Sequence, residues 1–242
     1  MKTRRIDMRR FWYLLIIGLV MLTQTSCTVS VHKNLTKGEA YAKMYEEKPV
    51  SILVMPPINN TSNVEAKDLL YTSISQHIAE AGYYVVSPIM AMDVFKNESA
   101  YDAEYFIHSS LNKFKEYFGA DAVVFAVIDK WAKEGFQIHT VVSYIVKSTT
   151  TNEILFERSC DMTLDLMKNS GYGNDLAGAL VGVLADVIVS AVDVATTDHI
   201  EAARIANMHV FSDMPFGKYS PLYLQDKDLM SKDKHLLLML RR

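Results

Sequence analysis

The chain has 242 residues, half of them hydrophobic, which excludes a globally disordered protein. Its formal net charge is −3, and an acidic chain lacks the electrostatic footprint of a nucleic-acid-binding protein. Two cysteines do not indicate a disulfide framework.

Residues 1–26 have the three parts of an export signal. Five basic residues and one acidic residue lie in residues 1–10, an uncharged apolar run occupies residues 11–22, and the small residues Thr25 and Ser26 follow. The apolar run is shorter than the roughly 20 residues of a spanning helix, which argues against an uncleaved membrane anchor. Removing residues 1–26 leaves 20 basic and 27 acidic residues, a net charge of −7.

Cys27 is the candidate lipidation site. The residues before it resemble a bacterial lipobox, in which the cysteine thiol receives a diacylglyceryl group and cleavage makes this cysteine the new N-terminus. The sequence departs from the lipobox pattern at Gln24, where leucine is favoured. The alternative is simple signal cleavage, but lipidation better explains a cysteine at this position. A thioether-linked lipid plus an N-terminal acyl chain such as palmitate anchors stably. Thr28 follows instead of aspartate, which indicates the outer membrane.

Residues 27–48 are expected to form a lipid anchor and tether that leads into a short helix near residues 38–47. The apolar run 50–55 is bounded by prolines and suits a strand covered on both faces. The turn-rich stretch "PPINNTSN" follows. Ser62 and Glu65 match a capping box and predict a helix that ends at Gly82.

The next elements continue a β-α-β-α-β order. Strands are expected at residues 83–87 and 120–131, with helices near residues 89–97 and 103–119 between them, and this order implies parallel strands with right-handed crossovers. Residues 136–150 and 153–162 predict two more strands that form an antiparallel meander with the third. The expected fold class is therefore α/β, a single domain with a mixed sheet.

A long helix is expected from about Asp175 to His199, packed on the sheet, with a further helical stretch that reaches Met208. It is mostly apolar, but Asp186 and Asp193 inside it make a membrane span costly. Gly178 and Gly182 form G-x-x-x-G, which favours close packing of this helix on the sheet; the alternative is an oligomer or membrane-contact face, and hence a homo-oligomer. Residues 226–242 are expected to form a C-terminal tail.

Candidate chemistry is scarce along the chain. The sequence lacks G-x-S-x-G, H-E-x-x-H, C-x-x-C and a Walker loop, so no catalytic residues and no cofactor are expected. The scattered histidines do not predict a metal site. Cys160 lies in an expected strand and is interpreted as a small buried hydrophobic residue.

One loop is a candidate for binding a ligand or partner, because it follows a parallel strand and enters a helix N-terminus. Its candidate residues are Asn59, Asn60, Thr61 and Ser62. The favoured alternative is that they form only the turn and the helix cap, since the loop has no lysine or arginine to hold a phosphate.

Residues 48–87, 118–131 and 214–223 together resemble a family of bacterial lipoproteins that includes a genome-derived vaccine antigen. The resemblance implies a periplasmic α/β domain over residues 49–225, similar to the N-terminal domain of TolB, the periplasmic part of CsgG and the lipoprotein LpoB. It brings no catalytic residues with it.

The resemblance also implies a role. We expect a non-enzymatic lipoprotein of the outer membrane, facing the periplasm, that is an assembly or accessory component beside a CsgG-like export lipoprotein. One alternative is an LpoB-like activator of a peptidoglycan synthase, which a tether of only about twenty residues disfavours at about 3.3–3.6 Å per residue. A hydrolase or metal enzyme is the less favoured alternative, since no convergent set of ionisable groups is predicted.

Overall fold

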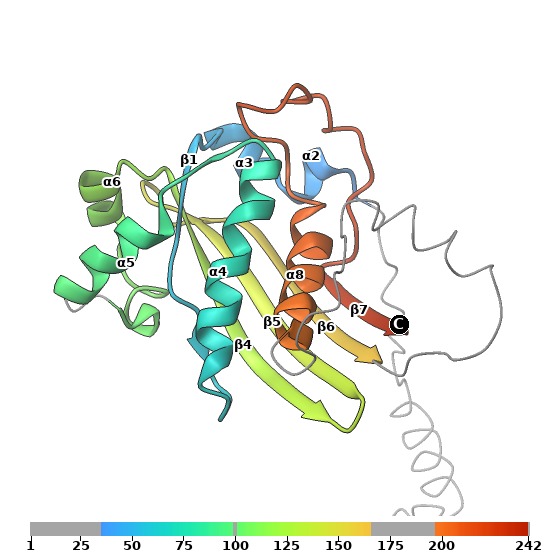
Figure 1. Ribbon diagram of the computed structural model, residues 1–242. Coiled ribbons are helices and arrows are strands. Elements are labelled where there is room, and N and C mark those ends of the chain that lie inside the picture. The colour runs from blue at the N-terminus through green and yellow to red at the C-terminus, as the bar shows by residue number, and fades with distance from the viewer. Residues whose placement is uncertain (1–34, 99–100, 166–196, 242) are drawn as a thin grey trace, which may run out of the picture. The chain divides into compact units, whose positions relative to one another are not determined.

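A seven-stranded mixed sheet organises the computed structural model, which describes residues 35–98, 101–165 and 197–241 (Figure 1). The strands run in the order β3-β1-β4-β5-β6-β7, and β2 pairs with β4 off this path. The strands are β1 (Ser51–Val54), β2 (Ile58–Asn59), β3 (Tyr84–Val85), β4 (Ala122–Glu134), β5 (Gln137–Ser148), β6 (Ile154–Asp165) and β7 (His235–Arg241). The helices are α2 (Lys37–Ala40), α3 (Ala42–Glu47), α4 (Glu65–Glu80), α5 (Pro88–Asn97), the short 3-10 helix η1 (Ala103–Tyr105), α6 (Asn112–Phe118) and α8 (Thr197–Phe211).

The first half of the sheet is parallel, which confirms the predicted β-α-β-α-β order. β1 pairs in parallel with β3 on one side and with β4 on the other. The alternate residues of β1 enter two separate cores: Ile52 and Val54 belong to one, and Leu53 belongs to the other. β1 is therefore covered on both faces, as its continuous apolar sequence predicts.

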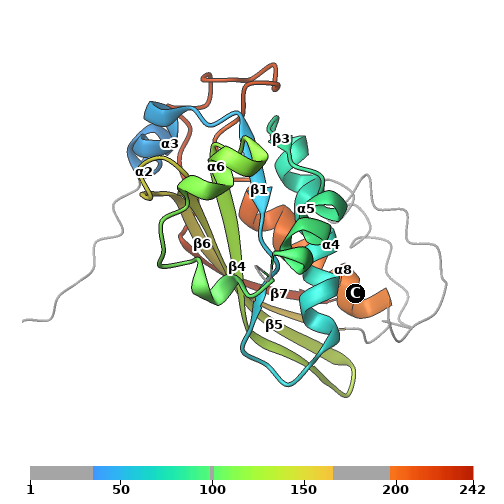
Figure 2. The ribbon, with the colours of Figure 1, turned by 90° about the vertical axis from the view of Figure 1, so that its left-hand side faces the viewer.

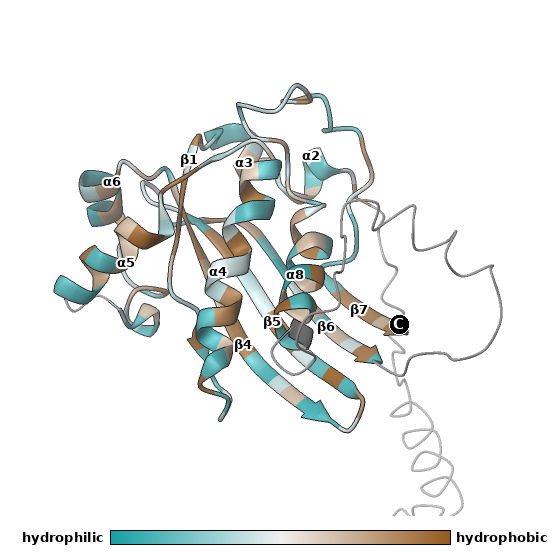
Figure 3. Cartoon of the chain, viewed as in Figure 1, coloured by the Kyte–Doolittle hydropathy of each residue, from teal (hydrophilic) through white to brown (hydrophobic). Residues whose placement is uncertain are grey.

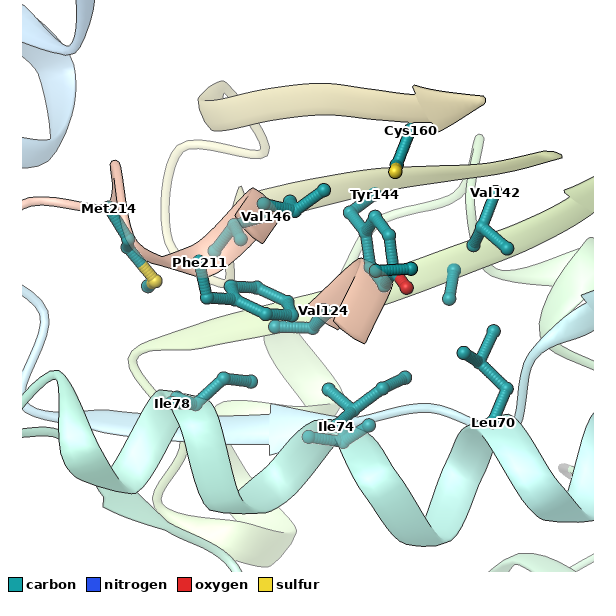
Figure 4. Close-up of a cluster of buried hydrophobic side chains, with 14 of the residues drawn as sticks. Leu70, Ile74, Ile78, Val124, Val142, Tyr144, Val146, Cys160, Phe211 and Met214 are labelled. Atoms are coloured by element: carbon teal, nitrogen blue, oxygen red, sulfur yellow. The ribbon is translucent and has the colours of Figure 1, made fainter. Parts of the chain in front are cut away.

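One core lies between the sheet and the helices α4 and α8. The buried residues of α4 recur every four positions, at Leu70, Ile74 and Ile78, because this spacing places side chains on one helix face. Figure 4 shows these three side chains pointing toward the sheet, with Phe211 from the end of α8 in the same cluster. Full burial of each such side chain contributes about 1.5–3 kcal/mol.

The second core lies on the opposite face of the sheet, under α5, η1 and α6 (Figure 2). It is rich in aromatic rings, and Phe95 meets Phe114 edge-on with 6.3 Å between the ring centroids. Val123 and Phe125 of β4 contribute the sheet side of this core. The sheet residues of this core come from β1, β2 and β4, and none of its described members lies on β6 or β7.

The strands β4, β5 and β6 form the predicted antiparallel meander. The turn between β4 and β5 contains Gly135 at a φ of 61°, and Asn152 takes a φ of 62° in the turn between β5 and β6. Both residue types tolerate this left-handed backbone, which explains why the chain reverses at these points.

The predicted long helix over residues 175–199 lies largely outside the described residues and stays a prediction. The further helical stretch is present: α8 begins at Thr197 and continues three residues past Met208, to Phe211. Its side chains Ala202, Ala203 and Ala206 are buried against the core.

The structure assigns regular elements to two segments that the sequence analysis placed outside the domain. His235–Arg241 of the expected tail form β7, which pairs in parallel with β6. At the other end, the short helix expected near residues 38–47 is present as α2 and α3, with Tyr41, Met44 and Tyr45 buried in the core. The compact unit begins at Leu35, so only residues 28–34 separate Cys27 from it.

Candidate functional site

Three of the sequence-predicted site residues lie outside the described residues. These are Cys27, the candidate lipidation site, and the glycine pair Gly178 and Gly182. Their roles therefore stay predictions. Within the described ranges, no helix is both long enough and apolar enough to cross a membrane.

The asparagine loop, residues 59–63, is held together by its own side chains. Asn59 Oδ1 accepts hydrogen bonds from the backbone N and the Oγ1 of Thr61 at 3.1 and 2.7 Å, and Asn59 Nδ2 donates to the carbonyl of Asn63 at 2.7 Å. Asn60 Nδ2 donates to Asp129 Oδ1 at 2.9 Å, which places a carboxylate beside the loop. These bonds favour the interpretation as a turn and helix cap, and the negative charge of Asp129 disfavours an anion site.

The cap of α4 differs from the predicted capping box. Asn63 Oδ1, and not the hydroxyl of Ser62, accepts from the backbone N of Glu65 and of Ala66, at 3.0 and 3.1 Å. Ser62 is exposed. Since asparagine and serine are comparably good caps, the S-x-x-E pattern selected the wrong neighbour by one position.

Cys160 is fully buried on β6, as predicted. Burial is the main cause that raises the pKa of its thiol to about 12, with a further contribution from Asp161. The thiol therefore remains protonated and unreactive at neutral pH.

The outer face of β5, β6 and β7 carries two cross-strand pairs that involve histidine. His139 Nε2 lies 2.8 Å from Asp161 Oδ1, and Ser159 Oγ lies 2.7 Å from His235 Nδ1. Nucleophilic catalysis by serine needs more than a serine–histidine pair. It also needs a group that orients the histidine and donors that bind an oxyanion, so this pair alone does not define such a site. Across the described residues, no three histidine, cysteine or acidic side chains are grouped to hold a metal ion.

A buried polar cluster joins α2 and α3 to the C-terminal loop, residues 212–234. Its members are Lys37, Tyr41, Arg158, Asp213 and Asp226. Lys37 Nζ lies 3.3 Å from Asp226 Oδ2, with both side chains at most 6% exposed. Tyr41 OH donates to Asp213 Oδ2 at 2.6 Å. Burial, and then this bond to Asp213, hold the pKa of Tyr41 far above its usual range, so the phenol stays a donor.

Arg158 connects this cluster to three carbonyl groups. Its Nη1 donates to the carbonyls of Val210 and His209 at 2.9 and 3.3 Å, at the C-terminal end of α8. Its Nη2 and Nε donate to the carbonyl of Asp233 at 2.7 and 3.3 Å. Arg158 is 1% exposed. The carbonyl dipoles that it contacts and the C-terminal end of α8 offset its buried positive charge.

Sequence reasoning missed the whole cluster. One signal was available for Arg158: the alternation of β6 puts it on the same face as Phe156 and Cys160, which point inward. The carboxylates Asp213 and Asp226 carry no comparable signal, because their partners lie 172 and 189 residues away in the chain.

The C-terminal loop also pairs with the first described residues of the chain, which form the entrance to the folded unit. Lys37 N donates to the carbonyl of Leu229 at 2.7 Å, and Ser231 N donates to the carbonyl of Leu35 at 2.9 Å. Beside this entrance, Leu229 and Met230 are 55% and 54% exposed. Apolar side chains are thus exposed where the chain from Cys27 arrives.

A further exposed apolar surface is on β7. It is the last strand in the described sheet order, and Figure 3 shows it as mostly hydrophobic. Leu236 and Leu238 pack against the core, whereas Leu237 and Met239 are 64% and 78% exposed on the other face. An apolar edge strand is a template for pairing with another extended chain.

Comparisons with known proteins show that this chain is similar to lipoproteins. The family described as "Putative lipoprotein GNA1162-like" matches residues 39–217. The curated "Putative lipoprotein NMB1124/NMB1162" of Neisseria meningitidis serogroup B is 25% identical over 178 residues, which are 73% of this chain and 81% of that protein.

Solved structures give two further likenesses. Lipoprotein GNA1162 from Neisseria meningitidis is 24% identical with a TM-score of 0.44, covering 57% of this chain and 96% of that chain. The LpoB C-terminal domain from Salmonella enterica is 12% identical with a TM-score of 0.31, covering 51% and 95%.

Proposed function

The chain belongs to the GNA1162-like lipoprotein family, and from this premise we propose that it is a lipid-anchored envelope protein that acts by binding other proteins and not by catalysis. Cys27 carries the lipid, and Thr28 after it favours the outer membrane. The domain then faces the periplasm, the compartment that a chain with an export signal enters first. Neither the matched family nor the curated relative has a description that states an enzymatic activity.

The single structural observation in favour of a binding role is β7. A seven-residue edge strand with exposed Leu237 and Met239 offers backbone groups and apolar side chains together. Strand addition uses both, because main-chain hydrogen bonds give affinity and alternate side chains give specificity. We assign this edge to an extended segment of a partner in an envelope complex, with a CsgG-like export lipoprotein as the leading partner.

In-cell crosslinking tests this function. A photo-crosslinking amino acid replaces Met239 in the full-length lipoprotein, and mass spectrometry identifies the captured neighbours. A matched control carries it at Phe136, which is 66% exposed on the β4–β5 turn. A second control is Cys27→Ala.

Three outcomes decide the proposal. Capture of a CsgG-like lipoprotein from position 239, absent from position 136 and lost with Cys27→Ala, is the expected result. Capture of a peptidoglycan synthase would replace the export role with the activator role. Equal capture from positions 239 and 136 would refute β7 as the binding edge.

A further inference from the structure

The proposed lipid at Cys27 limits how the folded unit is oriented on the membrane. Thr36, which pairs with Met230, lies nine residues after Cys27. Nine residues span at most about 32 Å even when fully extended. A unit of about 210 residues has a radius of gyration of about 17 Å and is about 40 Å across. Thr36 thus stays within about 32 Å of the lipid surface, which excludes an orientation with Thr36 on the side of the unit farthest from the membrane.

The C-terminal loop forms the surroundings of Thr36. The backbone bonds of Leu35 and Lys37 run to Ser231 and Leu229, and Gly38 N donates to the carbonyl of Lys227 at 2.9 Å. Figures 1 and 2 show this loop at the same end of the unit as α2 and α3, whereas the β4–β5 turn is at the other end.

The exposed side chains of this loop are mainly apolar, aromatic and basic, although the chain as a whole is acidic. Its exposed large hydrophobic residues are Tyr219, Leu222, Leu229 and Met230. Its lysines Lys218, Lys227, Lys232 and Lys234 are all exposed, with Lys234 paired to Glu157 of β6 at 2.6 Å, whereas Asp213 and Asp226 are buried. Only Asp228 and Asp233 are exposed acids. Apolar and aromatic side chains among lysines suit the headgroup region of an anionic membrane.

The loop is also held in place, so it can act as a surface. The ion pair of Lys37 with Asp226 fixes its later part. Its earlier part is fixed where Gly217 N donates to the carbonyl of Ala81 at 2.8 Å, an approach so close that a Cβ at Gly217 would lie 2.4 Å from the carbonyl oxygen of Gly82. A surface that is ordered beforehand loses little entropy on binding.

We propose that the C-terminal loop is a membrane-contact surface that seats Leu229 and Met230 in the headgroup region of anionic lipids. This inference rests on the proposed lipidation of Cys27. The lipid then supplies the attachment, and the loop fixes the orientation, with β7 and the sheet edge directed to the side and the β4–β5 turn away from the membrane.

Site-specific fluorescence tests the contact. The full-length lipoprotein with Leu229→Cys carries an environment-sensitive probe and is reconstituted in vesicles of phosphatidylethanolamine and phosphatidylglycerol. Cys160 is buried, so the probe reacts at the new thiol. The matched control is Phe136→Cys, which starts from a similarly exposed apolar residue at the far end. Vesicle flotation is measured on the same samples.

The expected result is flotation of both proteins, with a blue shift and quenching by nitroxide-labelled lipid for position 229 alone. Replacing phosphatidylglycerol with phosphatidylcholine should reduce that shift, and an unchanged shift would refute the preference for anionic lipid. Flotation with equal emission from positions 229 and 136 would overturn the contact while leaving the lipid anchor intact. Failure of both proteins to float would overturn the anchor, and the contact with it.

Discussion

The asparagine loop and the C-terminal loop both pair polar side chains within a connection, but their partners lie at opposite distances along the chain. Asn59 bonds to Thr61 and Asn63, within four residues of itself. Asp213 and Asp226 instead bond to Tyr41 and Lys37, in the α2–α3 segment at the other end of the described chain. Local pairing shapes most of the turn, whereas long-range pairing makes a joint between the two ends of the domain.

The largest expected effect comes from breaking the joint at Arg158. Arg158→Met keeps an apolar stem but removes the charged donor of the hydrogen bonds to the carbonyls of Val210 and Asp233. Hydrogen bonds to a charged group contribute about 1.5–3 kcal/mol each, so we expect a loss of about 3–5 kcal/mol in the free energy of unfolding. Urea denaturation followed by circular dichroism measures it.

Lys234→Met is the matched control for Arg158→Met. Lys234 pairs with Glu157 at 2.6 Å, but both side chains are substantially exposed. Exposed ion pairs contribute about 0–1 kcal/mol. Equal effects of the two variants would mean that the burial of Arg158 gives the joint no special role.

The asparagine loop should respond less, and its response separates two caps. Asn63→Ala removes the acceptor for the backbone N of Glu65 and of Ala66, so we expect a loss of about 1 kcal/mol. Ser62→Ala should change stability by less than about 0.5 kcal/mol, because Ser62 is exposed. Urea denaturation of both variants gives the comparison, and a larger loss from Ser62→Ala would restore the predicted capping box.

The two loops also show what the sequence could predict. The strand order β-α-β-α-β, the meander and the buried face of α4 follow from local periodicity and turn residues, so they were predictable. The cap on Asn63 was missed by one position because local patterns fix helix ends only to within a few residues. Cys27, Gly178 and Gly182 lie outside the described residues, and their predictions stand untested.

Long-range features could not be predicted in the same way. The polarity of Asp213 and Asp226 resembles that of any surface loop, and only the folded chain brings Tyr41 and Lys37 to them. The strand β7 was missed because "HLLLMLRR" is too short and too uniformly apolar to separate a strand from a loose tail. Its pairing with β6 bridges more than seventy residues, from Ser159 to His235.

The smallest expected effect is the response of the joint to pH, through His209. Burial is the main cause that lowers the pKa of His209, followed by Lys232 and Arg158. As the pH falls, His209 therefore binds a proton near pH 6.5 in the unfolded chain but only at a lower pH in the folded chain. The stability that depends on neutral His209 is fully present above pH 6.5 and declines as the pH falls toward the folded pKa. His209→Gln should flatten the stability curve between pH 7 and pH 5 by less than one proton, as measured by urea denaturation at each pH. His108→Gln, at an exposed position in the connection before α6, is the control. A steeper dependence of stability on pH for His209→Gln would mean that the folded state favours the charged imidazole. In that case the positive charges of Arg158 and Lys232 would not disfavour protonation of His209.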